Sequence, residues 1–159
     1  MIEKTLIILK PDSIQRGLIG EMVRRFEQRG LKILGMKMRL VDKELAKKHY
    51  SEHLEKKFYA SLEKFITSGP VVAMVVEGVD AVKAVRNMVG STEPHSAVPG
   101  TIRADFAHVS YSHADKEGKS IANLIHASGN KDDAKKEIDL WFNKGELHNY
   151  NTANEKHVF

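Results

Sequence analysis

The sequence predicts a mixed α/β fold in which helices pack on a four-stranded antiparallel sheet. Two observations lead to this prediction. Short apolar runs of strand length, such as residues 5–9 and 71–76, recur along the chain. Between them lie longer stretches whose apolar residues recur at helical spacing and which end at glycine or proline. The 159 residues are enough for one domain with a hydrophobic core, so we expect a single domain over residues 1–159.

The first predicted strand and helix lie at the start of the chain. The apolar run 5–9 is followed directly by Lys10 and Pro11, which predicts a buried central strand that ends in a proline turn. Apolar residues at helical spacing then predict a helix over 18–29, with Gly30 as its C-terminal stop.

The middle of the chain adds two strands and two helices. Residues 31–40 alternate between apolar and basic side chains, which predicts a second strand. Asp42 is suited to cap a helix that runs toward Tyr50, and a second helical stretch covers residues 59–67. The run 71–76 is apolar throughout and predicts a strand that is buried on both faces.

The second half of the chain completes the pattern. Asp80 is expected to cap a helix that ends at Gly90, residues 121–127 to form a fourth strand, and residues 132–142 a last helix. The resulting order, β-α-β-α-α-β-α-loop-β-α, matches a ferredoxin-like βαββαβ core.

Three segments carry weaker patterns. Residues 91–103 form a proline-containing loop that is long enough to suggest a function. The polar segment 106–121 has no clear pattern over most of its length. The polar C-terminal tail, residues 143–159, is expected to pack on a neighbouring molecule or to fray.

Composition limits the classes of function. The net charge of +4 favours anionic ligands, although acids and bases are interspersed and a mixed solvated surface explains the charge equally well. Cysteine is absent, which excludes disulfides, thiolate metal sites and a cysteine nucleophile. No apolar run approaches the roughly 20 residues of a membrane span, so we expect a cytoplasmic protein with no membrane contact.

One histidine, His126, stands out. Apolar residues precede it, small residues follow it, and Glu137 lies eleven positions later on a predicted helix. A neutral imidazole that is held by a carboxylate is a good nucleophile near pH 7. Groups suited to phosphate are present elsewhere, at Lys10, Arg86, Thr92 and Arg103. This combination suggests phosphoryl transfer through a phosphohistidine, with a packed strand histidine as the alternative.

The remaining histidines show no zinc spacing. His108 and His113 with Asp115 form a weak candidate for a metal site, and we predict no metal ligand among the protein side chains.

Six motifs in one order identify a family resemblance. They are Lys10-Pro11-Asp12, Arg16-Gly17-Leu18-Ile19-Gly20, His49-Tyr50 with Phe58, Thr67-Ser68-Gly69-Pro70, Pro99-Gly100-Thr101-Ile102-Arg103, and Asn123-x-x-His126. In this respect the chain resembles the nucleoside diphosphate kinases, over about residues 3–145.

The resemblance implies a function and a set of site residues. It implies ping-pong transfer of the γ-phosphoryl group from ATP or GTP to nucleoside diphosphates, with broad base specificity and with Mg²⁺ on the nucleotide phosphates. His126 then resembles the nucleophile, phosphorylated on its pros nitrogen, and Glu137 the carboxylate that orients it. Tyr50 and Ser128 match residues beside the nucleophile. The nucleotide-binding set is implied to be Lys10, His53, Phe58, Arg86, Thr92, Arg103 and Asn123.

The chain also departs from the family pattern. Ala127 and Gly129 stand where the family has glycine and aspartate, and Ala122 replaces an arginine. We expect Ala127 to be tolerated if its φ is negative, and Asn130 or Asp132 to take over from the lost aspartate. Residues 106–121 are an insertion relative to compact family members, and Ser120 is our expectation for the second wall of the base pocket.

The resemblance implies a homo-oligomer, a hexamer or alternatively a tetramer, with residues 91–103 and the tail as contact regions. A second hypothesis is a nucleotide-binding or nucleic-acid-binding protein on the same scaffold that has lost turnover, with Gly129 and the insertion as its traces. Retention of the nucleophile, its carboxylate and the phosphate ligands argues against this loss. Nucleic-acid binding is disfavoured because the aromatic pairs of an RNA-binding sheet are missing.

Overall fold

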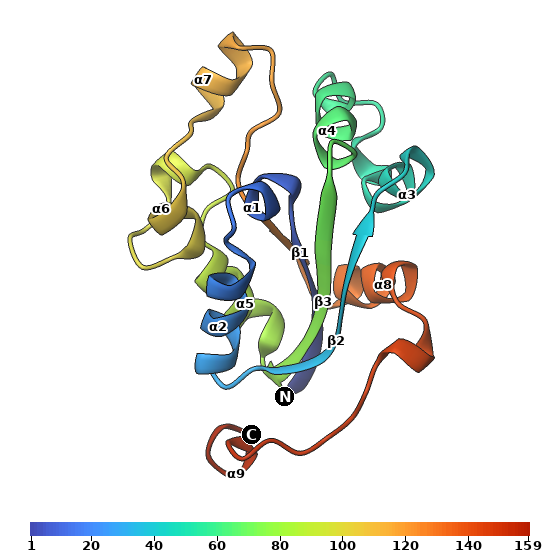
Figure 1. Ribbon diagram of the computed structural model, residues 1–159, viewed down its shortest axis with the longest axis vertical. Coiled ribbons are helices and arrows are strands. Elements are labelled where there is room, and N and C mark those ends of the chain that lie inside the picture. Colours follow the sequence, from blue (N-terminus) through green and yellow to red (C-terminus); the bar gives the residue numbers. More distant parts are fainter.

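A four-stranded antiparallel sheet in the order β2-β3-β1-β4 forms the centre of the computed structural model, which describes residues 1–159 (Figure 1). Its strands are β1 (Ile2–Leu9), β2 (Lys32–Leu40), β3 (Pro70–Val79) and β4 (Ile125–Ala127). β1 pairs with both β3 and β4, and β2 pairs with β3. The predicted fold class is therefore confirmed, with the apolar run at the start of the chain as a central strand.

Helices cover both faces of this sheet. One face carries α2 (Ile19–Gln28), α5 (Ala81–Val89) and α6 (Ile102–Phe106), and the other carries α3 (Lys43–His49), α4 (Tyr59–Ile66) and α8 (Lys131–Trp141). These helices lie on opposite sides of the strands in Figure 1. None of the helices is long and apolar enough to span a lipid bilayer.

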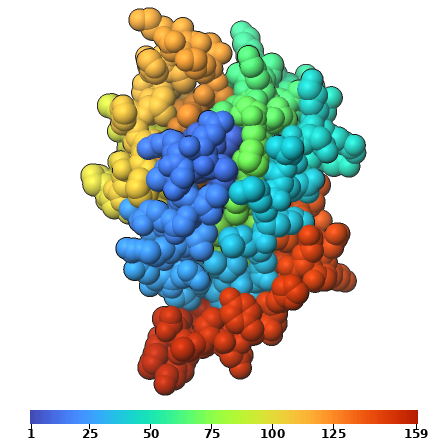
Figure 2. All heavy atoms as spheres, in the orientation of Figure 1, coloured from blue at the N-terminus to red at the C-terminus, as the bar shows by residue number.

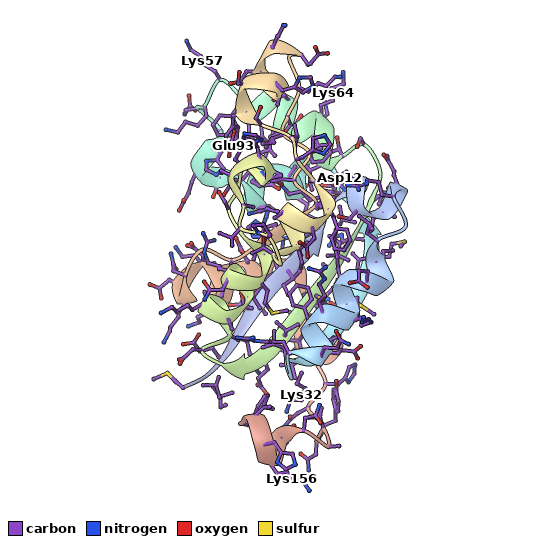
Figure 3. The ribbon with its side chains drawn as sticks, turned by 90° about the vertical axis from the view of Figure 1, so that its left-hand side faces the viewer. Asp12, Lys32, Lys57, Lys64, Glu93 and Lys156 are labelled. Atoms are coloured by element: carbon purple, nitrogen blue, oxygen red, sulfur yellow. The ribbon has the colours of Figure 1, made fainter.

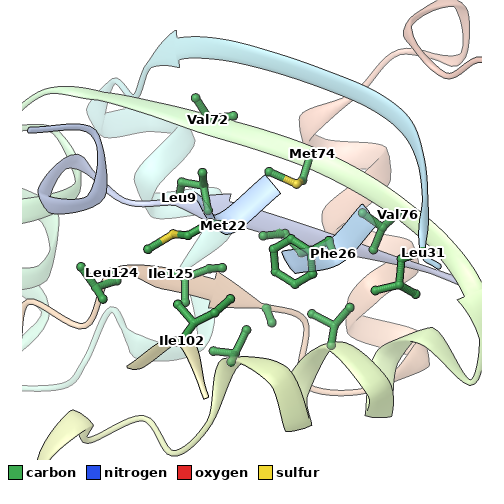
Figure 4. Packing of buried hydrophobic residues seen from close by; sticks show 14 of the residues in the cluster. Leu9, Met22, Phe26, Leu31, Val72, Met74, Val76, Ile102, Leu124 and Ile125 are labelled. Carbon is green, nitrogen blue, oxygen red and sulfur yellow. The ribbon is translucent and has the colours of Figure 1, made fainter. Parts of the chain in front are cut away.

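Alternation along β1 builds two cores. Ile7 and Leu9 face the helices α2 and α5, and Leu6 and Ile8 face α8, because successive side chains of a strand point to opposite faces. Figure 4 shows the first of these cores, with Phe26 of α2 among side chains of the sheet. Burial on both faces explains why the run is apolar without interruption.

The two predicted aspartate caps have different outcomes. Asp42 caps α3, because its carboxylate accepts a hydrogen bond from the Leu45 N–H at 2.8 Å, as predicted. Asp80 occupies the N-cap position of α5 and Gly90 ends the helix, as predicted, but the side chain of Asp80 makes no cap. Asp80 has a left-handed backbone with φ 46°, and its carboxylate accepts a hydrogen bond from the N-terminal ammonium group at 3.3 Å instead of capping α5.

Pro11 begins a helix, although the sequence analysis expected only a turn. The helix α1 (Pro11–Gln15) starts directly after the N-cap residue Lys10. Proline suits the first helical position because its missing N–H would have no partner there and its φ is already helical. Lys10 thereby lies at the junction between a central strand and a helix, at the end of the sheet.

The fourth strand is shorter than predicted. The prediction of a strand over residues 121–127 is wrong for its first four residues, and β4 begins at Ile125. Leu124 has φ 72°, in the left-handed region that non-glycine residues seldom adopt. Its N–H donates to Asp12 Oδ2 at 3.0 Å and its carbonyl accepts from the Lys10 N–H at 2.8 Å. Leu124 is nevertheless fully buried in the core, whereas Ile121 and Ala122 are only partly buried.

The segment 106–121 contains a short helix, α7 (Tyr111–Lys116), which no apolar periodicity indicates. Its start is capped by Ser110, whose hydroxyl accepts from the His113 N–H at 3.2 Å. In Figure 1, α7 and α4 stand at the same end of the molecule on opposite sides.

The C-terminal tail packs on its own chain and runs across one end of the molecule (Figure 2). The His148 N–H donates to the Leu34 carbonyl of β2 at 2.7 Å. Lys32 forms an ion pair with Glu155 at 2.9 Å, and Figure 3 shows Lys32 beside this last segment. The tail approaches β2 so closely that a Cβ at Gly35 would lie 2.5 Å from the Glu146 carbonyl oxygen. The tail therefore does not fray, contrary to one of our expectations.

Candidate functional site

A cleft of about 700 Å³ opens at the end of the sheet where β1 passes into α1. Its walls come from segments that are distant in the sequence, including α4 on one side and α7 on the other. The cleft brings together most of the predicted site residues, namely Lys10, Tyr50, His53, Phe58, Arg86, Thr92, Arg103, Asn123, His126 and Glu137. Ser128, the remaining one, lies behind this surface and is fully buried.

His126 is held by Glu137 through one nitrogen. Its Nε2 atom lies 3.0 Å from each carboxylate oxygen of Glu137, which reaches it from α8. β4 presents the ring next to the central strand, where the backbone is fixed by pairing with β1. Because Glu137 engages Nε2, the lone pair for a reaction is on Nδ1.

Ser128 forms a hydrogen bond with Glu137 and does not line the cleft. Its hydroxyl donates to Glu137 Oε2 at 2.6 Å and accepts from the Leu6 N–H at 3.2 Å. The hydroxyl therefore links the carboxylate to the backbone of the central strand. This arrangement fixes the rotamer of Glu137, and through it the ring of His126.

Lys10 is a buried cation without a carboxylate partner. Its ammonium group donates to Asn123 Oδ1 at 2.7 Å, and the Asn123 amide in turn donates to the Thr92 carbonyl at 2.8 Å. Burial, with the charge of nearby Arg103 second, lowers the pKa of Lys10 to about 8, although Asp12 opposes the shift. A buried cation with this surplus of positive charge is suited to bind an anion.

Arg103 is fixed by backbone carbonyl groups. Its guanidinium donates to Asn123 at 3.1 Å, to Gly90 at 3.0 Å and to Ile125 at 2.6 Å. Burial, with the charge of the neighbouring Arg86 second, lowers its pKa to about 10. Two of its five N–H groups stay free for a ligand. Arg86 and Thr92 are exposed and line the cleft.

An aromatic group forms the other side of the cleft. Phe58 precedes α4 and is 52% exposed, so it is a platform on the surface and not a core residue. The ring of His53 lies 5.5 Å from it. Tyr50 is buried with no hydrogen-bond partner for its hydroxyl, and burial, with the charge of Glu137 second, raises its pKa. The hydroxyl is therefore a neutral donor.

Several residues of this region were missed by the sequence analysis. Asp12 holds the Leu124 backbone, and burial raises the pKa of its carboxyl. His49 packs against His126 with ring centres 4.6 Å apart. Its position before Tyr50 in a family motif was the signal that could have found it. From α7 and the following turn, Tyr111 and Lys119 line the cleft together with Ser120, the residue expected there.

The residues at 127–130 that differ from the family pattern fit the local backbone. Ala127 does not have a positive φ, so its Cβ is tolerated as expected. Asn130 caps α8, because its side-chain oxygen accepts from the Asp133 N–H at 2.9 Å. The start of α8 is therefore capped by Asn130, one of the two residues that the sequence analysis named as a substitute for the missing aspartate. His108 and His113 do not come together in any potential metal-binding cluster.

Comparisons with known proteins agree on one family. The family model for nucleoside diphosphate kinase matches residues 3–147. A nucleoside diphosphate kinase of Pyrococcus abyssi is 53% identical over 153 residues, which is 96% of this chain and 92% of that protein. One of Borreliella burgdorferi is 48% identical over 161 residues, covering 98% and 96% of the two chains.

Solved structures show the same similarity. A transition-state mimic of the nucleoside diphosphate kinase from Borrelia burgdorferi, with bound vanadate and ADP, superposes with a TM-score of 0.95 at 46% identity and covers 99% of this chain and 96% of that one. The enzyme from Halobacterium salinarum, in complex with CDP, gives a TM-score of 0.89 at 43% identity, with 100% and 99% of the chains covered.

Proposed function

Because the chain belongs to the nucleoside diphosphate kinase family, whose members are phosphotransferases, we propose that His126 carries the phosphoryl group during the reaction. In the first half-reaction, Nδ1 of His126 attacks the γ-phosphorus of a nucleoside triphosphate. The bond between this phosphorus and the bridging oxygen breaks, and the diphosphate leaves. In the second half, a β-phosphate oxygen of another diphosphate attacks the phosphohistidine and regenerates His126.

The observation that carries this proposal is the hydrogen bond between His126 and Glu137. With both carboxylate oxygens 3.0 Å from Nε2, the proton stays on that nitrogen and the lone pair stays on Nδ1. Positive charge develops on the ring as the N–P bond forms, and the carboxylate stabilises it. Ser128 contributes by holding Glu137 in place.

The phosphates are proposed to bind against the cations of the cleft. Phosphoryl transfer depends mainly on positioning and on stabilisation of negative charge. Lys10 and Arg103 are buried and fixed by hydrogen bonds, so they need little reorganisation to do this. Arg86, Thr92 and the free hydroxyl of Tyr50 are available as further donors.

We propose that Mg²⁺ enters on the nucleotide. Glu137, the carboxylate beside His126, is already hydrogen-bonded to His126 and Ser128, and Asp12 is turned toward the Leu124 backbone. The residues around His126 therefore fit a cation that is held by phosphate oxygens and not by side chains. When bound, Mg²⁺ would neutralise part of the phosphate charge.

The base is proposed to stack on Phe58 near His53, and Asn123 with Lys10 to contact the ribose and phosphates. Stacking on an exposed ring does not read hydrogen-bonding edges, because every base has a π face. This supports broad use of nucleoside diphosphates. We also propose the cytoplasm, where these substrates are present, as the location.

A homo-oligomer is proposed on the basis of the exposed edge of β2. Met36, Met38 and Leu40 share one face of this strand and are 52%, 57% and 69% exposed. The C-terminal tail contacts β2 at Leu34, through a backbone hydrogen bond, and at Lys37, through an ion pair with Glu146, but it leaves these three side chains exposed. An apolar edge strand is a template for a second chain. We propose dimers through this edge, assembled into a hexamer or alternatively a tetramer.

The test is a two-step labelling experiment. The protein is incubated with γ-labelled ATP and Mg²⁺, freed of nucleotide and then mixed with unlabelled GDP. We expect a label that is acid-labile and base-stable, that moves to GDP and that His126→Ala abolishes. His157→Ala, at an exposed histidine of the tail, is the matched control. If ATP binds but the wild type takes up no label, the chain is a nucleotide-binding protein without turnover.

A further inference from the structure

His49 lies beside the proposed nucleophile and lines the cleft with it. It is the last residue of α3, and its ring packs edge-on against three neighbours. The ring centres of Tyr50 and His126 are each 4.6 Å away, and that of Trp141 is 5.5 Å away. The plane of His49 is inclined by 80° to that of His126. The His49 ring therefore packs directly against the His126 ring and limits the space into which that ring can turn.

Trp141 determines the protonation state of His49. The indole N–H donates to Nδ1 of His49 at 3.2 Å, and indole has no acceptor nitrogen. Nδ1 must therefore carry a lone pair, which places the proton on Nε2. Nε2 is buried and has no hydrogen-bond partner. A proton added to Nδ1 would meet the N–H of Trp141, so the cationic form is disfavoured.

The basic groups around His49 act in the same direction, while Glu137 is the one acidic group near it. Around His49 lie His126 on β4, Glu137 on α8, Lys10 after β1 and His53 after α3, and Arg39 of β2 lies over the Trp141 ring at 5.5 Å. Burial lowers the pKa of His49 well below its usual range, and His126, Lys10 and His53 lower it further.

Neutrality of His49 has a consequence for Glu137. A ring nitrogen of His49, a ring nitrogen of His126 and an oxygen of Glu137 all lie within 4.8 Å of one another. A cationic His49 would attract the carboxylate away from His126, and it would repel the positive charge that develops on that ring.

A metal ion is the other reading of these three residues. Nε2 of His126 is already hydrogen-bonded to Glu137, and Nδ1 of His49 to Trp141. Coordination through Nε2 of His49 would move its proton to Nδ1, against the indole N–H. These hydrogen bonds therefore favour protonated Nε2 atoms on both histidines over coordination of a metal ion.

We propose that His49 is a positioning residue for His126. Trp141 holds it as the neutral tautomer with the proton on Nε2, and in this form its ring fixes the orientation in which Nδ1 of His126 meets the phosphorus. The role in catalysis depends on the proposed function of His126, but the tautomer does not.

The tautomer is measured first, by NMR of the ¹⁵N-histidine-labelled wild-type protein between pH 5.5 and 8.5. The His49→Phe spectrum assigns the signals. We expect Nδ1 of His49 to be unprotonated and Nε2 protonated across this range. A proton on Nδ1, or titration of His49 to a cation within the range, would overturn the proposal whether or not the enzyme turns over.

The catalytic role is measured as the pH dependence of His126 phosphorylation in single-turnover experiments. In Trp141→Phe, Nδ1 of His49 can take up a proton, so we expect the acid limb of the rate to move to higher pH. In the double variant His49→Phe, Trp141→Phe, no such group exists, and the acid limb should return to its wild-type position. An equal loss of rate at all pH values, with no return in the double variant, would mean packing alone and would overturn the role.

A side-chain series provides the second readout. His49→Ala frees the His126 ring, so we expect the phosphorylation rate to fall about tenfold with unchanged ATP affinity. His49→Phe retains a ring and should recover most of this loss. If both variants lose the rate equally, or if ATP affinity falls instead, His49 does not position the nucleophile. Circular dichroism spectra and thermal unfolding show whether each variant is folded.

Discussion

Glu137 accepts from Nε2 of His126 with both carboxylate oxygens at 3.0 Å, and one of these oxygens also accepts from Ser128 at 2.6 Å. The carboxylate thus connects a ring on the short strand β4 to the backbone of the central strand β1, since Ser128 bonds to Leu6 as well. The orientation of the proposed nucleophile is therefore tied to the central strand of the sheet.

Replacing the charge of Glu137 is the direct test of this relationship. Glu137→Gln keeps an oxygen acceptor but cannot stabilise the positive charge that develops on the ring. We expect the rate of His126 phosphorylation to fall about 10- to 100-fold, with unchanged ATP affinity. Rapid-quench measurement of the labelled enzyme gives the rate, and equilibrium binding of ATP gives the affinity. Glu44→Gln, at an exposed carboxylate of α3, is the control and should behave as the wild type. A wild-type rate in Glu137→Gln would remove Glu137 from the mechanism.

The lowered pKa of Lys10 predicts a pH dependence of stability. Lys10 has a folded-state pKa of about 8 against 10.5 in the unfolded chain, so the folded protein resists its charging. The penalty is full below pH 8 and is lost as the pH rises from about 8 to 10.5. Relative to Lys10→Gln, the free energy of unfolding of the wild type should therefore rise by about 1–2 kcal/mol between pH 7 and 9.5.

Urea unfolding without nucleotide measures this difference. Lys83→Gln, at an exposed lysine of α5, should show the same pH dependence as the wild type. With ADP bound, the free energy of unfolding should instead fall as the pH rises, because bound phosphate favours charged Lys10. The affinity for ADP should likewise fall above pH 8. If the free energy of unfolding of the wild type and that of Lys10→Gln change by the same amount between pH 7 and 9.5, the lowered pKa of Lys10 is contradicted.

The exposed ring of Phe58 predicts an affinity effect that does not depend on the base. Phe58→Ala should weaken binding of ADP, GDP and CDP by a similar factor of about tenfold, since stacking contributes about 1–3 kcal/mol per base. Calorimetric titration with each diphosphate measures the loss, and Phe58→Tyr, which keeps the ring, should restore most of it. A loss confined to one base would show that the pocket reads hydrogen-bonding groups instead.

The apolar edge of β2 predicts an effect on assembly. A charge at Met38, which is 57% exposed, would be desolvated in a dimer through this strand, so Met38→Glu should give a smaller species in sedimentation velocity experiments. Val79→Glu, at a 43% exposed apolar residue on β3, is the matched control and should leave the assembly unchanged. An unchanged sedimentation coefficient in Met38→Glu would exclude this edge as the contact.

Local patterns along the chain determined the fold class and most of its elements. The uninterrupted apolar run of β1 identified a central strand because both of its faces are buried, and Asp42 identified a helix start because its cap is a contact over three residues. These effects act between neighbours in the sequence. Asp80 shows the limit of such reasoning, because its carboxylate pairs with an N-terminus that only folding brings near.

The site residues were indicated by motifs, but their relationships were decided by tertiary structure. Lys10 and Asn123 are separated by 113 positions, and the lowered pKa of Lys10 comes from burial and from Arg103, neither of which is visible in the sequence. Leu124 interrupts the predicted fourth strand because Asp12 holds its N–H from another element. His49 gained its place beside His126 only through the packing of α3 against α8. The periodicity of a segment shows which of its faces is buried. The charge, tautomer and orientation of a site side chain depend on residues that other segments place beside it in the folded structure.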